Sequence, residues 1–171
     1  MPRQLLIMVC VSAFMAFAIS FLPSMAKTPY SQEMAVFSEH QQMNLTEQNL
    51  VDLFTLMPTH YNIKRVKWEN RAIFVDLSVT PEEKLDVPVF YLDTYTLIHR
   101  TFRLTKNVEH VFLRLLEEDK QTAKLLVYIQ ATRPLSIRDL PAPERVTDPQ
   151  KYVESTFQVR IEPALHERVH P

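Results

Sequence analysis

The sequence predicts an α+β fold, a two-layer sandwich of two helices on a mainly antiparallel sheet of four or five strands. Two pairs of apolar, strand-like segments, each joined by a short polar turn, indicate two hairpins. Segments with apolar residues at helical spacing come before and between these hairpins. A late alternating segment provides one more strand. This order of elements is typical of helices packed beside an antiparallel sheet.

Residues 1–26 precede this domain and are expected to be a signal peptide or a membrane anchor. An uncharged apolar run extends over Leu5–Leu22, and Ser24 and Ala26 fit the pattern that a signal peptidase reads. The run exceeds the usual signal core and, as a helix, would nearly span a bilayer. Cleavage after Ala26 and retention as a single anchor both fit it. Because Arg3 precedes the run, we expect the rest of the chain outside the cytoplasm, secreted or tethered at the cell envelope.

The composition excludes several kinds of site. The chain has no glycine, and phosphate-binding loops, dinucleotide fingerprints and nucleophile elbows all require it. The single cysteine, Cys10, lies in the apolar run, so cleavage after Ala26 would leave none. A cleaved chain would therefore hold no disulfide, cysteine nucleophile or thiolate metal site. The formal net charge of −1 gives no basic excess that would favour nucleic acid.

A polar stem over residues 27–43 is expected to lead into a core domain over 44–133. The first helix is predicted to begin at the start of this core domain, with Asn44 or Thr46 capping its first turn, and to end at Pro58. Its apolar face consists of Leu50, Leu53, Phe54 and Met57.

The first hairpin is predicted within residues 63–79. Its second strand alternates over 72–79, with the apolar side chains on one face. Asn70 lies in the connecting turn and is suited to the positive φ that a tight turn needs in a chain without glycine.

A second helix is expected from Pro88 to about Arg103, covering one face of the sheet. Its apolar stripe is Tyr91, Tyr95, Ile98 and Phe102, broadened by Leu92. Its polar face is Asp93, Thr96, Arg100 and Arg103. The second hairpin, over 108–116 and 122–132, is more completely apolar than the first, so we expect its strands to be central.

The C-terminal third is expected to be mostly extended. Four prolines predict a Pro-rich connection over 134–149, partly of polyproline character. Alternation over 157–161 predicts a last strand within a terminal segment at 150–163, and a tail follows at 164–171. Such a stretch could add a strand to the sheet edge of a partner or of a second copy, which would allow self-association.

The middle of the chain resembles the GerMN domain of bacterial envelope and sporulation lipoproteins. The resemblance covers about residues 60–130 and rests on Phe74-Val75-Asp76-Leu77-Ser78, on Thr94-Tyr95-Thr96-Leu97 and on Val108-Glu109-His110-Val111-Phe112-Leu113. This chain departs from the family where the turn after the last strand reads Glu118-Asp119-Lys120 instead of containing a glycine. The resemblance implies an envelope domain with a recognition or assembly role and carries over no catalytic residues.

The C-terminal pattern H-E-x-x-H is the sharpest chemical motif, with His166, Glu167 and His170. Two histidines four apart share one face of a helix and can bind Zn²⁺, while the glutamate activates a water. Only Pro171 follows, whereas such patterns find their third ligand downstream, and a solvated tail explains the match as well. A zinc-dependent hydrolase is therefore the alternative function, and the main interpretation needs no cofactor.

Two groups of cations are the candidate binding residues. Lys64, Arg65, Lys67 and Arg71 belong to the first hairpin, and Arg100 and Arg103 lie near the end of the second helix. They could contact an anionic wall polymer, a lipid surface or an acidic protein. Protection of an edge strand explains the hairpin cations equally simply.

These observations together favour a non-catalytic binding or assembly domain of the cell envelope. Its expected partner is an envelope protein or a wall component, and nucleic acid is not expected.

Overall fold

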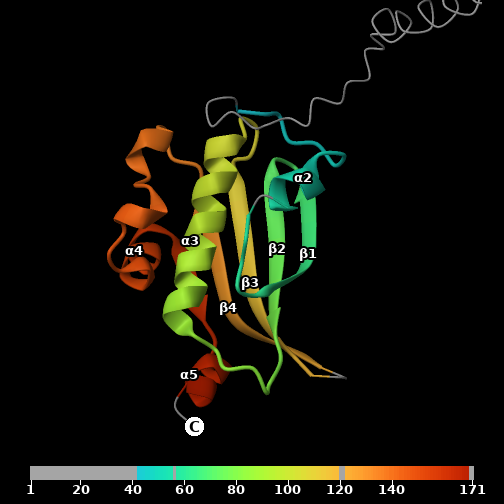
Figure 1. The fold of residues 1–171 in the computed structure, drawn as a ribbon, viewed down its shortest axis with the longest axis vertical. Coiled ribbons are helices and arrows are strands. Elements are labelled where there is room, and N and C mark those ends of the chain that lie inside the picture. Colours follow the sequence, from blue (N-terminus) through green and yellow to red (C-terminus); the bar gives the residue numbers. More distant parts are fainter. Residues whose placement is uncertain (1–41, 56, 120–121, 170–171) are drawn as a thin grey trace, which may run out of the picture. The chain divides into compact units, whose positions relative to one another are not determined.

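A five-stranded sheet in the order β1-β2-β3-β4-β5 organises the domain (Figure 1). The computed structural model describes residues 42–55, 57–119 and 122–169. The predicted anchor at Leu5–Leu22, the cleavage site after Ala26 and nearly all of the stem lie outside these residues. In the described part of the chain, no helix is both long and apolar enough to cross a membrane.

The described elements confirm the α+β class. The strands are β1 (Asn62–Glu69), β2 (Ala72–Val79), β3 (His110–Glu118), β4 (Ala123–Thr132) and β5 (Gln158–Ile161). The helices are α2 (Leu50–Thr55), α3 (Val87–Leu104), α4 (Pro149–Thr156) and α5 (Pro163–Val169), with short 3₁₀ turns η1 (Ile137–Asp139) and η2 (Pro143–Arg145). Only the β2–β3 pair is parallel among the described strands, so the sheet is mainly antiparallel, as predicted.

The first hairpin turns on two residues with positive φ. Asn70 has φ 48°, as its position in the sequence predicted, and Arg71 has φ 64°. Positive φ at both central residues matches the twist of the two strands, and glycine commonly fills the second position. Here the Arg71 carbonyl accepts hydrogen bonds from the amides of Glu109 and His110, at 2.8 and 3.3 Å, which ties the turn to β3.

The two hairpins meet at the parallel β2–β3 pair, in the middle of the sheet. Parallel neighbours need a crossover connection, and α3 provides it. The second hairpin therefore supplies inner strands, as its apolar composition predicted.

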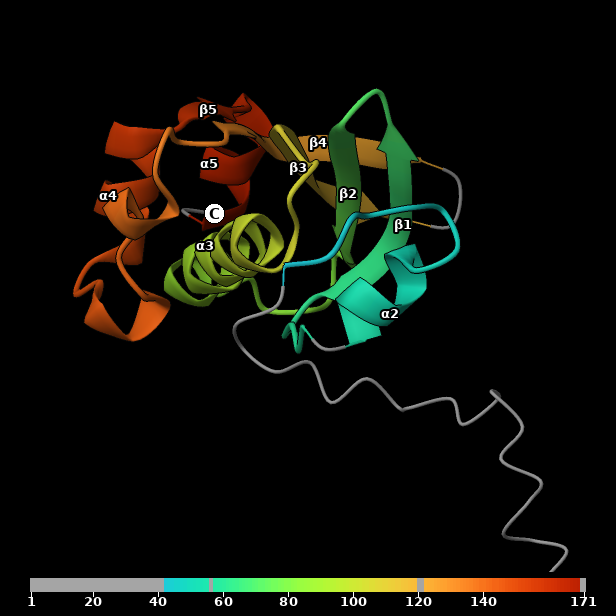
Figure 2. The same ribbon diagram turned by 90° about the horizontal axis from the view of Figure 1, so that it is seen from above.

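The core lies between α3 and one face of the sheet. Ile73, Val75 and Leu77 of β2 and Leu113 of β3 are at most 1 % exposed, and their neighbours in the chain point the other way. Figure 2 shows α2, α3 and α4 on the same side of the sheet. The predicted covering helix is thus α3, and burial of its aromatic stripe supplies much of the hydrophobic stabilisation.

The first helix is shorter than predicted. It begins at Leu50 rather than near Asn44, because the side chain of Asn49 accepts from the Thr46 amide at 2.7 Å and donates to the Asn44 carbonyl at 3.0 Å. These local bonds replace a first helical turn over 44–47. The apolar positions Leu53 and Phe54 are buried as predicted.

The second helix lies within one residue of its predicted bounds at each end, but two of its positions were wrongly assigned. Asp86 caps it by accepting from the Val89 amide at 3.1 Å, and Pro88 occupies its first turn. Leu92, expected on the apolar stripe, is 38 % exposed. Asp93, expected on the polar face, is only 5 % exposed, because it accepts two hydrogen bonds from the loop before β1.

Three corrections concern the C-terminal third. The connection over 134–149 contains η1 and η2, so it is not simply extended. The terminal segment at 150–163 begins with α4, whose start is capped by Asp148 before Pro149. The strand predicted over 157–161 follows as β5 and pairs with β4 of the same chain. The expected tail forms α5, in which Leu165 is 6 % exposed and therefore docked on the core.

Arg133 joins the end of α3 to the second hairpin. Its guanidinium donates to the carbonyls of Phe102, Thr105 and Val108 at 3.0, 2.6 and 2.5 Å. The guanidinium carbon also lies 5.1 Å from the centroid of the Phe102 ring. Carbonyls at a helix C-terminus lack intrahelical partners, so this one side chain satisfies two of them.

Candidate functional site

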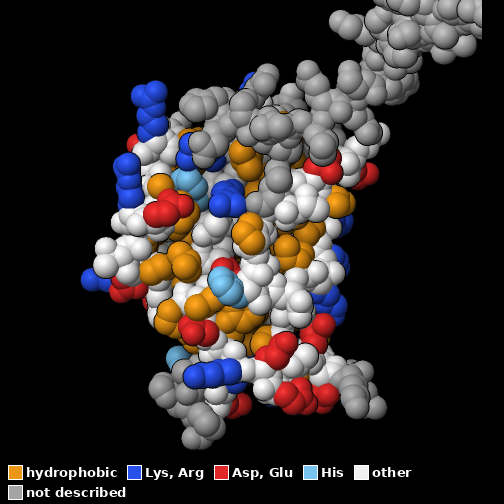
Figure 3. Space-filling model, in the orientation of Figure 1, with side chains coloured by type: hydrophobic (Ala, Val, Ile, Leu, Met, Phe, Trp, Pro, Cys, Tyr) orange, Lys and Arg blue, Asp and Glu red, His pale blue; other side chains and the backbone are white. Residues whose placement is uncertain are grey.

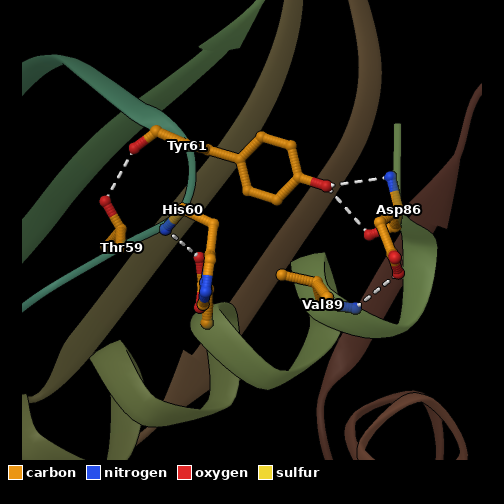
Figure 4. Close-up of polar contacts among 6 residues, drawn as sticks. Thr59, His60, Tyr61, Asp86 and Val89 are labelled. Carbon is orange, nitrogen blue, oxygen red and sulfur yellow. Dashed lines mark hydrogen bonds and ion pairs between the residues drawn. The ribbon is translucent and has the colours of Figure 1, made fainter. Parts of the chain in front are cut away.

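One polar cluster lies where the loop before β1 meets the first turns of α3 (Figure 4). The backbone amide of His60 donates to Asp93 Oδ2 at 2.6 Å, and His60 Nδ1 lies 2.9 Å from Asp93 Oδ1. The His60 side chain is 72 % exposed, whereas that of Asp93 is 6 % exposed. A buried carboxylate thus fixes an exposed imidazole through its Nδ1 atom.

Tyr61 fastens the same loop to the start of α3. Its hydroxyl donates to the Asp86 carbonyl at 2.8 Å and accepts from the Asp86 amide at 3.1 Å (Figure 4). Burial raises the pKa of Tyr61, while the hydrogen bond to Asp86 acts in the opposite direction. A cavity of about 250 Å³ adjoins the cluster, lined by His60, Tyr61, Asn62, Ser78, Val79, Glu83 and Lys84.

The His60–Asp93 pair acts mainly as a clamp. A histidine oriented by a carboxylate can serve as a general base, provided that a nucleophile lies within hydrogen-bonding distance. Among the residues that the structure describes, no hydroxyl bonds to the His60 ring. The observed bonds hold the loop before β1 against α3.

The second candidate site is the face of the sheet turned away from α3, which we call the open face because α2, α3 and α4 lie on the other side (Figure 2). Strand register aligns one side chain from each strand in a line across this face, which we call the arginine row. The arginine row consists of Arg65, Asp76, Arg114, Tyr128 and Arg160. It carries three positive charges and one negative charge.

Asp76 organises two of these arginines. Arg114 donates through Nε to Oδ1 at 2.7 Å and through Nη2 to Oδ2 at 2.8 Å, and Arg65 Nε donates to Oδ2 at 2.9 Å. Burial raises the pKa of Asp76, but the bonds and charges of Arg114 and Arg65 outweigh it, so that the pKa lies below its ordinary value. The Asp76 side chain is 6 % exposed, while those of Arg65 and Arg114 are 58 % and 39 % exposed. Both guanidiniums are therefore held by the buried carboxylate, while a large part of each arginine side chain stays exposed.

A second line of side chains runs beside the arginine row, two residues further along each strand. Its members are Lys67, Phe74, Phe112, Gln130 and Gln158. The rings of Phe74 and Phe112 stack with centroids 4.8 Å apart and planes 16° apart. Each therefore covers part of the face of the other, and the remaining members are polar.

The structure separates the candidate binding cations. Arg65 and Lys67 lie on the open face, with Lys67 paired to Glu69 at 2.5 Å. Lys64 occupies a β-bulge and pairs with Glu118, and Arg71 pairs with Glu109 at 2.7 Å at the turn. Since β1 is an edge strand, its cations and bulge also suit edge protection.

Arg100 and Arg103 lie on α3, on the other side of the sheet from the arginine row. That helix-bearing side shows hydrophobic side chains interspersed with both signs of charge (Figure 3). The six predicted cations therefore do not form one surface.

The H-E-x-x-H motif is only partly visible. His166 and Glu167 are exposed on α5, whereas His170 lies outside the described residues. Within the described ranges, no group of three or more His, Cys, Asp or Glu side chains could hold a metal ion. The zinc interpretation remains a prediction.

Sequence reasoning missed Asp76, Arg114, Tyr128 and Arg160 as site residues. The alternation of β2 placed Asp76 opposite the core, which was a usable signal. The parallel register of β2 and β3, which brings Asp76 to Arg114, has no local signature in the chain.

Comparison of the chain with family models, with curated proteins and with solved structures gave no match. The resemblance to the GerMN domain therefore stays a prediction.

Proposed function

We propose that the protein is a non-catalytic binding domain that works outside the cytoplasm, at the cell envelope, through the open face of its sheet. Its partner is an envelope protein or a wall component. The proposal takes the domain as a two-layer sandwich in which helices cover only one face. The arginine row on the uncovered face is the observation that carries it.

Three features of the arginine row support a binding role. Arg160 is 73 % exposed, so at least one guanidinium of the row is freely reachable. Arg65 and Arg114 are pre-oriented by Asp76, which lowers the entropy cost of meeting a ligand. Guanidinium groups recognise carboxylates and phosphates through paired hydrogen bonds.

The location follows from the apolar run Leu5–Leu22 and the Ser24-Met25-Ala26 sequence, which support export. Fractionation of cells that produce the full chain, with N-terminal sequencing of the recovered protein, tests this part. We expect the protein outside the cytoplasm, either beginning at Lys27 or retained in the membrane. Recovery of full-length protein in the cytoplasm would contradict it.

Site-specific photocrosslinking in intact cells tests the binding surface. A photoreactive residue at Gln158, which is exposed on the open face, should give a discrete adduct that disappears when Arg160→Gln is added. The matched control places the same group at Lys151, exposed on α4. Equal labelling from both positions, or no adduct at Gln158, would count against the open face as the binding surface.

A further inference from the structure

We propose that the ligand of the open face is an acidic glycan, lying across the strands along the arginine row. This inference rests on the proposed function and names the ligand class. It follows from the spacing of the arginines, from the polarity of the surrounding side chains and from the packing of the two phenylalanine rings.

The arginines occupy alternate strands of the sheet. Arg65 lies on β1, Arg114 on β3 and Arg160 on β5, all in one register line. Neighbouring strands are about 4.8 Å apart, so successive arginine positions lie about 10 Å apart. An extended peptide places side chains of one face about 7 Å apart, which does not match. Anionic groups separated by roughly a disaccharide unit do match.

The side chains around the arginine row suit a ligand rich in hydroxyl groups. Gln130, Gln158 and Thr132 offer amide and hydroxyl groups beside Tyr128. The two phenylalanine rings and Tyr128 on this face are half-buried and packed against one another. Because protein-docking surfaces usually have an apolar centre with few charges, a face whose rings are already packed among charged and amide side chains favours a glycan over a protein surface.

The aromatic pair disfavours single-stranded nucleic acid. Proteins that bind such strands without base pairing stack the bases on free aromatic ring faces. Phe74 and Phe112 already cover each other, at 4.8 Å between centroids. They form an apolar floor beside the arginine row rather than a platform for bases.

Asp76 orients two arginines of the arginine row without cancelling the positive charge of the row. One carboxylate serves two guanidiniums, so the Arg65–Asp76–Arg114 group keeps a net positive charge. Arg160 also pairs with Glu162 at 2.6 Å, yet its side chain is 73 % exposed, which leaves donors for a ligand. Carboxylate or phosphate groups of the glycan would accept hydrogen bonds from these donors.

The test is direct binding of fluorescently labelled polymers to the purified protein, followed by anisotropy. Polygalacturonate and poly(glycerol phosphate) are the acidic probes, with carboxylate and phosphate chemistry respectively. Dextran, poly-L-glutamate and an oligo-dT strand are the uncharged, polypeptide and nucleic-acid comparisons. We expect saturable binding of polygalacturonate that weakens at higher salt, whereas binding of poly(glycerol phosphate) alone would assign the face to a polyol phosphate and overturn the glycan.

Arg160→Gln should weaken this binding about tenfold, because it removes one charged contact from an exposed side chain, although Glu162 also loses its ion pair. Arg65→Gln, also on the exposed margin of the row, should act in the same direction. Arg103→Gln, on the opposite side of the sheet, is the matched charge control and should bind as the unmodified protein does.

Several outcomes overturn the inference. Equal or tighter binding of poly-L-glutamate or oligo-dT would assign the face to another class of polymer, and equal weakening by Arg103→Gln would show unspecific charge attraction. No binding of either acidic probe, together with an Arg160-dependent crosslink in cells, would reject the glycan but keep the proposed function. If neither acidic probe binds and no Arg160-dependent crosslink forms in cells, both the glycan and the proposed function are rejected.

Discussion

Asp76 and Arg114 lie opposite each other on the parallel strands β2 and β3, and two hydrogen bonds of 2.7 and 2.8 Å join their side chains. The pair links the two hairpins on the open face, while the apolar core links them on the other. It therefore serves both the cohesion of the sheet and the arrangement of the arginine row.

Asp76→Asn should lower the free energy of unfolding by about 2 kcal/mol at neutral pH, since two partly exposed guanidiniums lose their carboxylate. The folded-state pKa of Asp76 is depressed, so its contribution is present above the unfolded value near 4 and fades as pH falls through the folded value. Urea unfolding from pH 7 down to pH 2 should show the two proteins converging in acid. A difference that stays constant over this range would contradict the assignment.

Arg133→Lys should destabilise the protein by about 2–3 kcal/mol, because an ammonium cannot reach three carbonyls in the way that the planar guanidinium does. Thermal and urea unfolding measure the loss. Arg138→Lys, in the loop after β4, is the control and should change stability by no more than about 0.5 kcal/mol. Similar effects of the two substitutions would mean that the bonds of Arg133 contribute little.

Arg71→Gly should stabilise the protein by about 0.5–1 kcal/mol. Glycine removes the cost of φ 64° for a residue with a Cβ, and the lost ion pair to Glu109 is exposed and therefore weak. Glu109→Gln is the companion variant, which removes the pair without changing the turn. A loss of stability in Arg71→Gly larger than in Glu109→Gln would refute this balance.

Asp93→Ala should cost about 2–3 kcal/mol, because the His60 amide and ring both lose their acceptor. His60→Ala removes an exposed ring but keeps the hydrogen bond from the backbone amide of residue 60 to Asp93, so it should cost about 1 kcal/mol or less. Unfolding curves of the two variants, compared side by side, separate the contributions. Equal losses of stability in the two variants would show that the imidazole, rather than the backbone amide, makes the stabilising contact with Asp93.

Zinc should be substoichiometric in the purified protein, and addition of zinc should leave its melting temperature unchanged. α5 is only seven residues long, and His166 is exposed at its surface. Metal analysis by mass spectrometry measures the zinc content, thermal unfolding measures the melting temperature, and both are repeated on His166→Ala. One equivalent of zinc that disappears in the variant would revive the hydrolase interpretation.

Local patterns predicted the elements whose periodicity is set by a buried face. The structure confirms the alternation of 72–79 and the aromatic stripe of α3. Both patterns are visible in the sequence because the apolar positions are the buried ones. The turn at Asn70 was predictable since few other residues accept positive φ.

Predictions failed where a single polar contact decided the outcome. From the sequence, Asp93 was predicted to lie on the surface. In the structure it is buried, and the loop at His60 provides the hydrogen-bond partners of its carboxylate. The start of α4 was signalled by Asp148 before Pro149, but strand-like alternation further on obscured it. The arginine row depends on register between distant strands, which no local window contains.

The parallel pairing of β2 and β3 also has a consequence for the order of folding. Each hairpin closes over a short loop, whereas the contact between Asp76 and Arg114 spans 38 positions of the chain. Loop closure slows such distant pairings, so we expect the hairpins to form first and the seam between them to close last. Until that moment each hairpin exposes an inner edge that can pair wrongly with another chain. The proposed export would place this stage outside the cytoplasm, before the sheet closes between β2 and β3.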